Sequence, residues 1–314
     1  MEYYFAPMEG LTDSIYRRLH SKYFPGINKY YTPFFSPTAH RQLTGKERRE
    51  LPPAGDLSYT AVPQILTKNA QDFIWMANQC AERGYQEVNL NLGCPSGTVT
   101  AKGKGAGMLT DTAMLDSFLY EIFQSATADI SVKTRIGFTN PEEFPAILEV
   151  FNRYPIKELT IHPRVRNAFY NGNVDKKAFL YGLSNSKAPV CFNGNLCSKE
   201  DILQASKDYP QIDSVMIGRG LIADPGMLSS SDTARDTLEA FYNDLLEEYL
   251  IAFGGSRNAM FRLKENWHYL ICKFDGGEKL VKRLRKTTDL NEYKAITGEI
   301  FKTLPMRSAV IPNW

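Results

Sequence analysis

The chain of 314 residues is 43% hydrophobic, 23% charged and 12% aromatic, which is ordinary globular composition and excludes collagen, coiled-coil and wholly disordered proteins. Its net charge of +2 is unevenly distributed: residues 256–314 carry 12 lysines and arginines against 6 acidic residues, whereas residues 1–255 carry 25 against 29. A basic C-terminal fifth indicates an appendage that binds a polyanion, or equally a solvated lysine-rich helix face.

The sequence lacks the patterns of a membrane, secreted or metal-binding protein. No run reaches the roughly 18 apolar residues of a membrane-spanning helix, and residues 1–5 have no basic signal region. Five cysteines and four histidines are scattered without zinc-ligand or disulfide-framework spacing. We therefore expect a cytoplasmic monomer with no membrane segment and no metal.

Short apolar, β-branched runs recur along the first 220 residues. The predicted strands are 3–9, 27–33, 61–66, 87–94, 129–137, 158–164, 188–195 and 214–220. The predicted helices between them are 69–84, 110–125, 141–154 and 198–209, with capping signals at Asn69 and Ser198 and a first-turn proline at Pro141. Eight strands alternating with helices predict a (β/α)8 TIM barrel. A doubly wound sheet is the alternative, but no glycine-rich fingerprint follows the first strand.

The strand pattern stops after residue 231. Helical patterns then cover 232–253, 256–273, 278–286 and 289–303. In the first, the residues near one face are Leu238, Phe241, Leu245, Tyr249 and Ala252. The sequence therefore predicts a barrel domain over residues 1–231, followed by a small helical domain over residues 232–314 that contains the basic segment.

Polar residues fall at the C-terminal ends of the predicted strands, where barrel active sites lie. They include Gln64, Asn91, Lys133, His162 and Arg164. Two glycine turns, 193–195 and 218–220, follow the seventh and eighth strands, where barrels commonly bind phosphate. Each turn alone is explained by a tight chain reversal, but their coincidence favours a phosphate site to which Arg219 adds charge.

Two residues indicate redox chemistry at these strand ends. Lys133 lies in an otherwise apolar and small strand, so we expect it to point into the barrel mouth and stabilise negative charge, such as that on a reduced flavin. Cys94 precedes a proline where the fourth strand ends, and a thiol of pKa roughly 8.5 suits a general acid. The alternative for Cys94 is a small buried hydrophobe, which is what we expect of the other four cysteines.

The block Asn91-Leu92-Gly93-Cys94-Pro95-Ser96, followed by the basic glycine-rich segment 102–109, resembles the tRNA-dihydrouridine synthases of the short bacterial type. Motifs at 6–10, 64, 132–137, 161–164, 193–195 and 216–220 agree with that family in order and spacing. Two positions depart from it: Val165 stands where many members have threonine, and Asn195 where the residue is often acidic.

The resemblance implies a barrel that binds FMN, a helical domain that holds tRNA, and NADPH as the reductant. It implies that hydride reaches C6 of a uracil and that Cys94 protonates C5. The implied flavin-binding residues are Pro7, Met8, Gln64, Lys133, His162, Asn193, Gly194, Asn195, Gly218 and Arg219. Asn91 and Arg164 are implied near the uracil, and the basic residues Lys102, Lys282, Arg283 and Arg285 suit contacts to the RNA backbone.

Two other functions fit parts of the pattern. A flavin barrel that reduces a free pyrimidine or enoate explains the phosphate turns and Lys133, but it leaves the basic helices without a role. A non-catalytic RNA-binding protein on a degenerate barrel explains the basic helices, but it leaves Cys94, Lys133 and Arg219 without a role.

Overall fold

A computed structural model of the chain describes residues 1–38, 40–230 and 232–314, so residue 231, where the predicted domain boundary falls, lies outside the described part. The chain divides into two compact units. The barrel unit comprises Met1–Pro7, Asn28–Asn195 and Ala205–Met216, and the helical unit comprises Met8–Ile27, Leu196–Gln204 and Ile217–Trp314. The predicted boundary after residue 231 stays a prediction.

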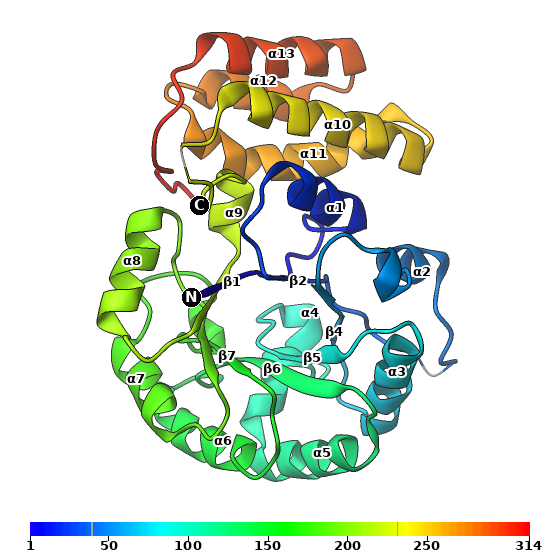
Figure 1. Cartoon of the computed structure of the whole chain (residues 1–314), viewed down its shortest axis with the longest axis vertical. Helices are drawn as coiled ribbons and strands as arrows, with labels where there is room; N and C mark the ends of the chain where they lie inside the picture. Colours follow the sequence, from blue (N-terminus) through cyan, green and yellow to red (C-terminus); the bar gives the residue numbers. More distant parts are fainter. Residues whose placement is uncertain (39, 231) are drawn as a thin grey trace. The chain divides into compact units, whose positions relative to one another are not determined.

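The strands of the barrel unit form one parallel sheet (Figure 1). They are β1 (Glu2–Phe5), β2 (Lys29–Tyr31), β3 (Ala61–Val62), β4 (Gln64–Ile65), β5 (Glu87–Leu92), β6 (Asp129–Arg135), β7 (Leu159–His162), β8 (Val190–Phe192) and β9 (Ser214–Ile217). Their order is β3-β2-β1-β9-β8-β7-β6-β5-β4. The strands run parallel in the pairs β1–β2, β2–β3, β4–β5, β5–β6, β6–β7, β7–β8 and β8–β9.

The sheet closes on itself at Pro63. β3 pairs with β2 and β4 pairs with β5, yet only this proline separates β3 from β4 in the chain. Proline has no N–H to donate to a ladder, which explains the break within one predicted strand. Counted as one, β3 and β4 give eight strands, so the predicted (β/α)8 barrel is confirmed and the doubly wound alternative is wrong.

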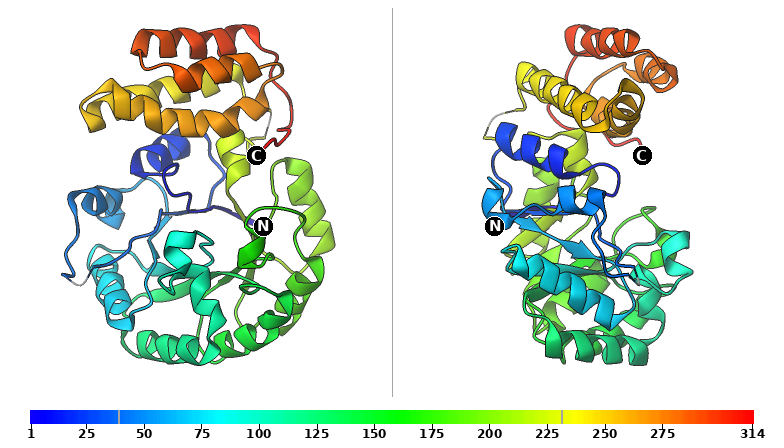
Figure 2. Two further views of the ribbon diagram at one scale, coloured as in Figure 1. Left: turned by 180° about the vertical axis from the view of Figure 1, so that it is seen from behind. Right: turned by 90° about the vertical axis from the view of Figure 1, so that its right-hand side faces the viewer.

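Most helical segments of the barrel unit surround its strands, whereas one short helix, α4, lies over the middle of the ring in Figure 1 (Figures 1 and 2). They are α2 (Gly45–Glu50), η1 (Ala54–Asp56), α3 (Ala70–Glu82), α4 (Gly97–Thr100), η2 (Gly105–Thr110), α5 (Thr112–Ser125), η3 (Pro141–Glu143), α6 (Phe144–Phe151), η4 (Arg166–Ala168) and α7 (Lys176–Asn185). The predicted caps form: the Asn69 side chain accepts from the Asp72 N–H, and Pro141 begins η3. The helix α7, whose N-cap is Asp175, was not predicted from the sequence.

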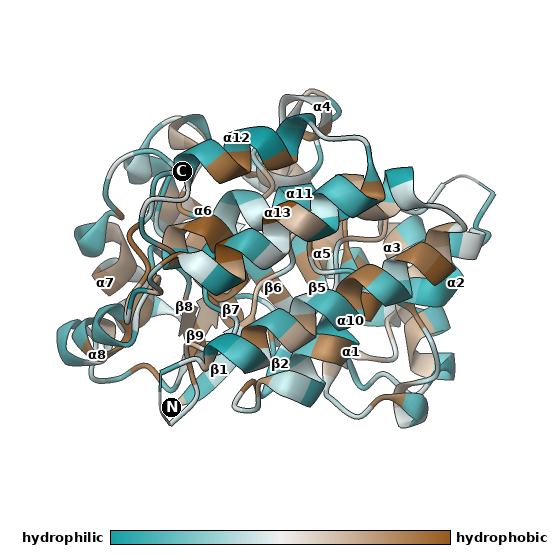
Figure 3. Ribbon diagram, turned by 90° about the horizontal axis from the view of Figure 1, so that it is seen from above, coloured by the Kyte–Doolittle hydropathy of each residue, from teal (hydrophilic) through white to brown (hydrophobic). Residues whose placement is uncertain are grey.

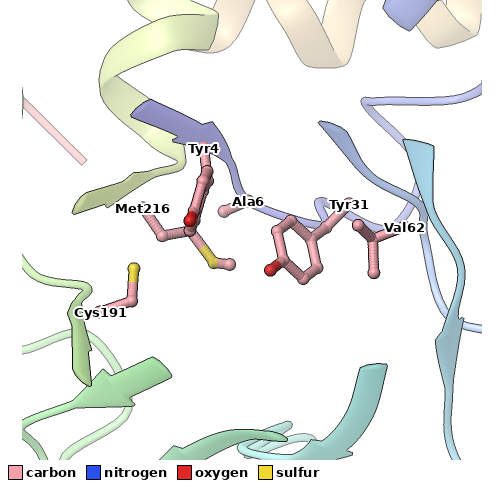
Figure 4. Close-up of a cluster of buried hydrophobic side chains, with 6 residues drawn as sticks. All are labelled: Tyr4, Ala6, Tyr31, Val62, Cys191 and Met216. Atoms are coloured by element: carbon pink, nitrogen blue, oxygen red, sulfur yellow. The ribbon is translucent and has the colours of Figure 1, made fainter. Parts of the chain in front are cut away.

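Side chains fill the barrel interior. A buried cluster of Tyr4, Ala6, Tyr31, Val62, Cys191 and Met216 comes from β1, β2, β3, β8 and β9 and the residue after β1 (Figure 4). The Tyr4 hydroxyl donates to Glu2 Oε2 at 2.6 Å and to Glu158 Oε1 at 3.1 Å. The barrel is therefore a packed core rather than a pore, which confines ligand binding to the strand ends.

The helical unit contains the C-terminal helices predicted from the sequence. Its elements are α1 (Ser14–Tyr23), α9 (Arg219–Ala223), α10 (Arg235–Phe253), α11 (Ser256–Leu270), η5 (Ile271–Lys273), α12 (Glu278–Lys286) and α13 (Leu290–Thr303), and α8 (Lys199–Asp208) begins in it. α1 and α9 were not predicted. α10 ends at Gly254, whose φ of 63° suits glycine at a helix C-terminus. Of the predicted α10 face, Ala252 is exposed because it lies in the last turn, whereas the other four residues are buried.

Neither a membrane-spanning helix nor a metal-binding cluster occurs among the described residues. No helix there is both long and apolar enough to cross a membrane. Within the same residues, no group of three or more histidine, cysteine, aspartate or glutamate side chains could hold a metal ion.

Candidate active site

The polar residues predicted at the strand ends come together through the register of the barrel sheet. Asn91 of β5 pairs with Lys133 of β6, and Arg135 of β6 pairs with His162 of β7. Asn193 follows β8 directly, and its N–H donates to the Ile161 carbonyl at 3.0 Å. Because parallel strands end on the same side of a barrel, these residues share its C-terminal face.

A chain of buried amides leads from the barrel interior to Cys94. Asn89 Nδ2 donates to Ser131 Oγ at 3.0 Å, and Gln64 Nε2 donates to Asn89 Oδ1 at 2.8 Å. Asn91 Nδ2 in turn donates to Gln64 Oε1 at 2.8 Å. Asn91 Oδ1 accepts from the Cys94 N–H at 2.9 Å. Each amide fixes the orientation of the next, so the backbone at Cys94 is held by partners inside the barrel.

Cys94 is the cysteine that a ligand can reach. Its side chain is partly exposed, whereas Cys80, Cys191, Cys197 and Cys272 are buried. Burial raises the pKa of Cys80 to about 12 and that of Cys197 to about 11, so these thiols hold their protons. The expectation that these four are buried is confirmed.

The loop after α4 packs over Cys94. The Ala106 N–H donates to the Cys94 carbonyl at 3.2 Å. Gly105 has a φ of 57°, and a Cβ there would lie 3.0 Å from the Cys94 Cβ. Glycine at 105 thus lets the loop approach the thiol closely. Lys102 lies exposed on this loop, and Lys104 Nζ donates to Ser36 Oγ at 3.3 Å.

Lys133 is held at the mouth of the barrel by Asn193. Its Nζ donates to Asn193 Oδ1 at 2.7 Å, and Asn193 Nδ2 donates to the Met216 carbonyl at 2.7 Å, which fixes the amide orientation. Burial, with a smaller contribution from Arg135, lowers the pKa of Lys133 to about 8. A negative charge placed beside this ammonium group would be stabilised and would restore its pKa.

His162, the last residue of β7, and Arg164 form one buried unit. Arg164 Nη1 donates to His162 Nε2 at 2.9 Å, which leaves Nδ1 to carry the proton of a neutral imidazole. Arg164 also donates to the carbonyls of Asn171 and Gly172. The arginine therefore fixes both the histidine ring and the loop that follows it.

Arg135, within the predicted strand 129–137, is a site residue that the sequence alone did not single out. Its Nε donates to the Gly93 carbonyl at 2.8 Å, and its Nη1 donates to the carbonyls of Val165 at 3.0 Å and Phe169 at 2.7 Å. Its guanidinium lies 5.4 Å from the Tyr170 ring centre. Arg135 thus joins the turn before Cys94 to the loop after β7. Its position two residues after Lys133 could have pointed to it, because residues at i and i+2 of a strand place their side chains on the same face.

A family model described as "Dihydrouridine synthase (Dus)" matches residues 4–272. The chain belongs to the dihydrouridine synthase family. Its class is therefore oxidoreductase.

Curated relatives agree with this family. The chain is 26% identical over 223 residues to tRNA-dihydrouridine synthase B of Pasteurella multocida, a match that covers 71% of this chain and 66% of that protein. It is 26% identical over 309 residues to a probable tRNA-dihydrouridine synthase of Staphylococcus aureus, covering 94% and 91%. The chain thus matches slightly under two thirds of the first relative's length.

A solved structure shares the fold. The old yellow enzyme homologue from Zymomonas mobilis has a TM-score of 0.52 and 10% identity to this chain, covering 71% of this chain and 86% of that one. At this identity the likeness supports the barrel fold alone.

The other predicted flavin residues of this family member lie in both units. In the barrel unit, Pro7 follows β1, and Gly194 and Asn195 follow Asn193; a Cβ on Gly194 would lie 2.5 Å from the Phe192 ring. In the helical unit, Gly218 is the N-cap of α9 and the Arg219 guanidinium lies 5.7 Å from the Trp314 ring centre. The Met8 N–H donates to Thr12 Oγ1 at 3.0 Å. Contacts between these two sets stay predictions.

The three predicted RNA-binding residues of α12 have different surroundings. Lys282 and Arg285 line a pocket within the helical unit. Arg283 instead pairs with Glu299 of α13 at 3.4 Å. The prediction that all three contact RNA stays untested, but Arg283 already has an anionic partner.

Proposed function

We propose that this family member is a tRNA-dihydrouridine synthase, which reduces the C5–C6 double bond of specific tRNA uridines with FMN as its flavin and NADPH as its reductant. The observation that carries the proposal is the pairing of Asn91 with Lys133 across β5 and β6. Asn91 holds the turn that carries Cys94, a thiol that a ligand can reach. Lys133, on the neighbouring strand, is a cation that an anionic partner would stabilise. Such a pair suits a reaction that needs a proton donor and a flavin.

The residues at the strand ends fit FMN. When bound, the flavin would pass hydride from NADPH to C6 of the uracil. Lys133 would contact its polar edge, since the lowered pKa of this lysine favours a negatively charged neighbour. The remaining flavin residues in this proposal are Pro7, Met8, Gln64, His162, Asn193, Gly194, Asn195, Gly218 and Arg219. Gln64 is fully buried with its amide bound to Asn89 and Asn91, so we assign it the task of orienting Asn91 as well.

Cys94 would act as the general acid. Hydride addition at C6 leaves negative charge that spreads to C5 and O4 of the uracil, and the Cys94 thiol supplies the proton that C5 takes up. The thiolate then recovers a proton from solvent, which the partial exposure of Cys94 allows. Asn91 would keep the thiol at a constant position during this transfer, and Arg164 would lie near the uracil.

The substrate must bring its uracil out of the RNA stack. A base inside folded tRNA cannot reach a barrel mouth unless it is unstacked, at a cost of a few kcal/mol. Lys102 near Cys94, together with Lys282 and Arg285 of α12, would hold the RNA backbone during that step, whereas Arg283 of the same helix is already paired with Glu299 and would contribute little. Phe169 and Tyr170 are 41% and 50% exposed on the loop after β7, and both offer rings to an unstacked base.

The decisive experiment supplies the purified, FMN-loaded protein with NADPH and tRNA transcripts that carry no modifications. We expect a yellow protein and a gain of two hydrogen atoms at specific uridines, read by mass spectrometry of RNA fragments. A colourless protein that takes up no FMN would contradict the proposal. Turnover of free uridine as fast as of tRNA would instead favour the flavin barrel acting on small molecules.

A further inference from the structure

A pocket of about 680 Å³ lies within the helical unit, between the end of α11 with η5, the helix α12 and the C-terminal segment. That volume falls within the roughly 300–1,000 Å³ of small-molecule sites. Figure 3 shows α12 as mostly hydrophilic (teal) with hydrophobic (brown) patches along it. The flavin site and the acid Cys94 do not use this pocket.

Backbone hydrogen bonds build the wall opposite α12. The Asp275 N–H donates to the Pro305 carbonyl at 2.9 Å, and the Arg307 N–H donates to the Lys273 carbonyl at 2.8 Å. Arg307 also reaches back to the carbonyls of Cys272 and Phe274 and pairs with Asp275. The C-terminal segment is thereby fixed against η5, so the pocket is formed before any ligand arrives.

One rim of the pocket is strongly cationic. Lys282, Arg285 and Lys286 line it from α12, with Glu278 as the single acid among the lining side chains. Arg285 Nη2 donates to His268 Nδ1 at 2.6 Å, which orients the guanidinium. In the described part of the chain, the side-chain ammonium groups of Lys282 and Lys286 have no hydrogen-bond or ion-pair partner. Two exposed ammonium groups and one oriented guanidinium favour a phosphate group.

The floor of the same pocket is apolar. Ile271, Phe274 and Val281 are buried beneath it, and Ile311 is 62% exposed at its edge. A double-helical RNA presents phosphates without free base faces, so it would leave this floor in contact with water. A nucleotide that is not stacked offers both a phosphate for the rim and a flat base for the floor.

We infer that this pocket binds one unpaired nucleotide of RNA, with its phosphate on Lys282, Arg285 and Lys286 and its base against Ile311 and the apolar floor. The inference rests on the proposed function only in naming tRNA as the natural source of that nucleotide. It differs from a purely electrostatic role of α12, because here the helical unit takes up a base as well as phosphates.

The test measures binding of the full-length protein to three labelled probes: a single-stranded oligouridylate, an RNA duplex of equal length, and uridine monophosphate. We expect the single strand to bind tightest. The variant Lys282→Ala/Lys286→Ala should weaken single-strand binding by roughly tenfold or more, with a flatter salt dependence. Ile311→Ala, at an exposed position, should weaken it by about threefold and leave the salt dependence unchanged.

The matched control is Lys279→Ala/Lys302→Ala, which removes the same charge from exposed positions outside the pocket lining. We expect less than a twofold change. Equal losses in both double variants, or equal binding of duplex and single strand, would overturn the inference. Tight binding of the mononucleotide with no binding of the oligouridylate would also overturn it, in favour of a free nucleotide. None of these outcomes depends on flavin or turnover, so a failure here is distinct from a failure of the proposed function.

Discussion

The cations at the barrel mouth and those of α12 differ in how they are held. Arg135 and Arg164 are buried and donate to backbone carbonyls on loops around the Cys94 turn and after β7. Lys282 and Lys286 are exposed, and no described residue binds them. A fixed cation defines the position of neighbouring atoms, whereas an exposed one adapts to a flexible polyanion and is screened by salt. We therefore expect single-atom changes to alter chemistry in the barrel unit and charge changes to alter affinity in the helical unit.

Removal of the Cys94 thiol should give the largest effect. If Cys94 donates the proton to C5, Cys94→Ala should lower dihydrouridine formation by roughly 10²–10⁴-fold, the usual contribution of general acid catalysis. FMN retention, reduction by NADPH and tRNA affinity should be unchanged. The measurement is single-turnover formation of dihydrouridine. Cys80→Ala is the control, since that buried thiol is outside the site, and turnover of Cys94→Ala at the parental rate would disprove the acid role.

Asn91→Ala should give the next largest effect, because it cuts the amide chain. The change would leave Gln64 Oε1 and the Cys94 N–H without their present partners. Unsatisfied buried polar groups cost roughly 1–3 kcal/mol each, so the loss of partners by these two groups should lower the free energy of unfolding by about 2–6 kcal/mol. Urea denaturation measures it. The exposed Asn258→Ala should stay within about 0.5 kcal/mol. If the free energy of unfolding of Asn91→Ala fell by less than about 1 kcal/mol, the row of buried amides would not be what holds the turn at Cys94.

Local features of the fold and the site were predictable from the sequence, whereas contacts between distant segments were not. The eight strands follow from local apolar patterning, and Cys94 with its neighbours follows from a compact motif. The role of Arg135 does not, because its partners are backbone carbonyls 30–42 residues away in the chain. The amide chain likewise joins three strands. The helix α7 was missed because exposed Leu180 and Tyr181 interrupt the apolar pattern that would mark one buried face.

Lys133 should make FMN affinity depend on pH. Its pKa in the flavin-free protein is about 8, below its ordinary value of 10.5. The carbonyl oxygens at the polar edge of the flavin bind a protonated lysine more tightly than a neutral amine, so FMN affinity should be constant below pH 8 and fall above it by at most tenfold per pH unit. Equilibrium dialysis measures this, and Lys133→Ala should bind FMN more weakly without that decline.

The same lysine has the opposite effect on the flavin-free fold. Between pH 8 and about 10.5 the unfolded chain binds the Lys133 proton more tightly than the folded one, so this group's contribution to the free energy of unfolding rises with pH.

Parallel declines of FMN affinity in the parental protein and in Lys133→Ala would assign the pH dependence to another group.

Arg283→Ala should give the smallest effect. Together with Lys282→Ala it compares a position off the pocket face of α12 with one on that face. Glu278, Lys282 and Arg285 follow i, i+4, i+7 spacing and face the pocket, whereas Arg283 lies off that face and pairs with Glu299. Both members of that pair are about half exposed, so its loss should change the free energy of unfolding by less than about 1 kcal/mol. Because Glu299 already offsets its charge, RNA affinity should change by less than about twofold and the salt dependence should stay the same. If Arg283→Ala weakened RNA binding as much as Lys282→Ala does, the cations of α12 would act through their summed charge, and the distinction between the pocket face and the rest of the helix would be lost.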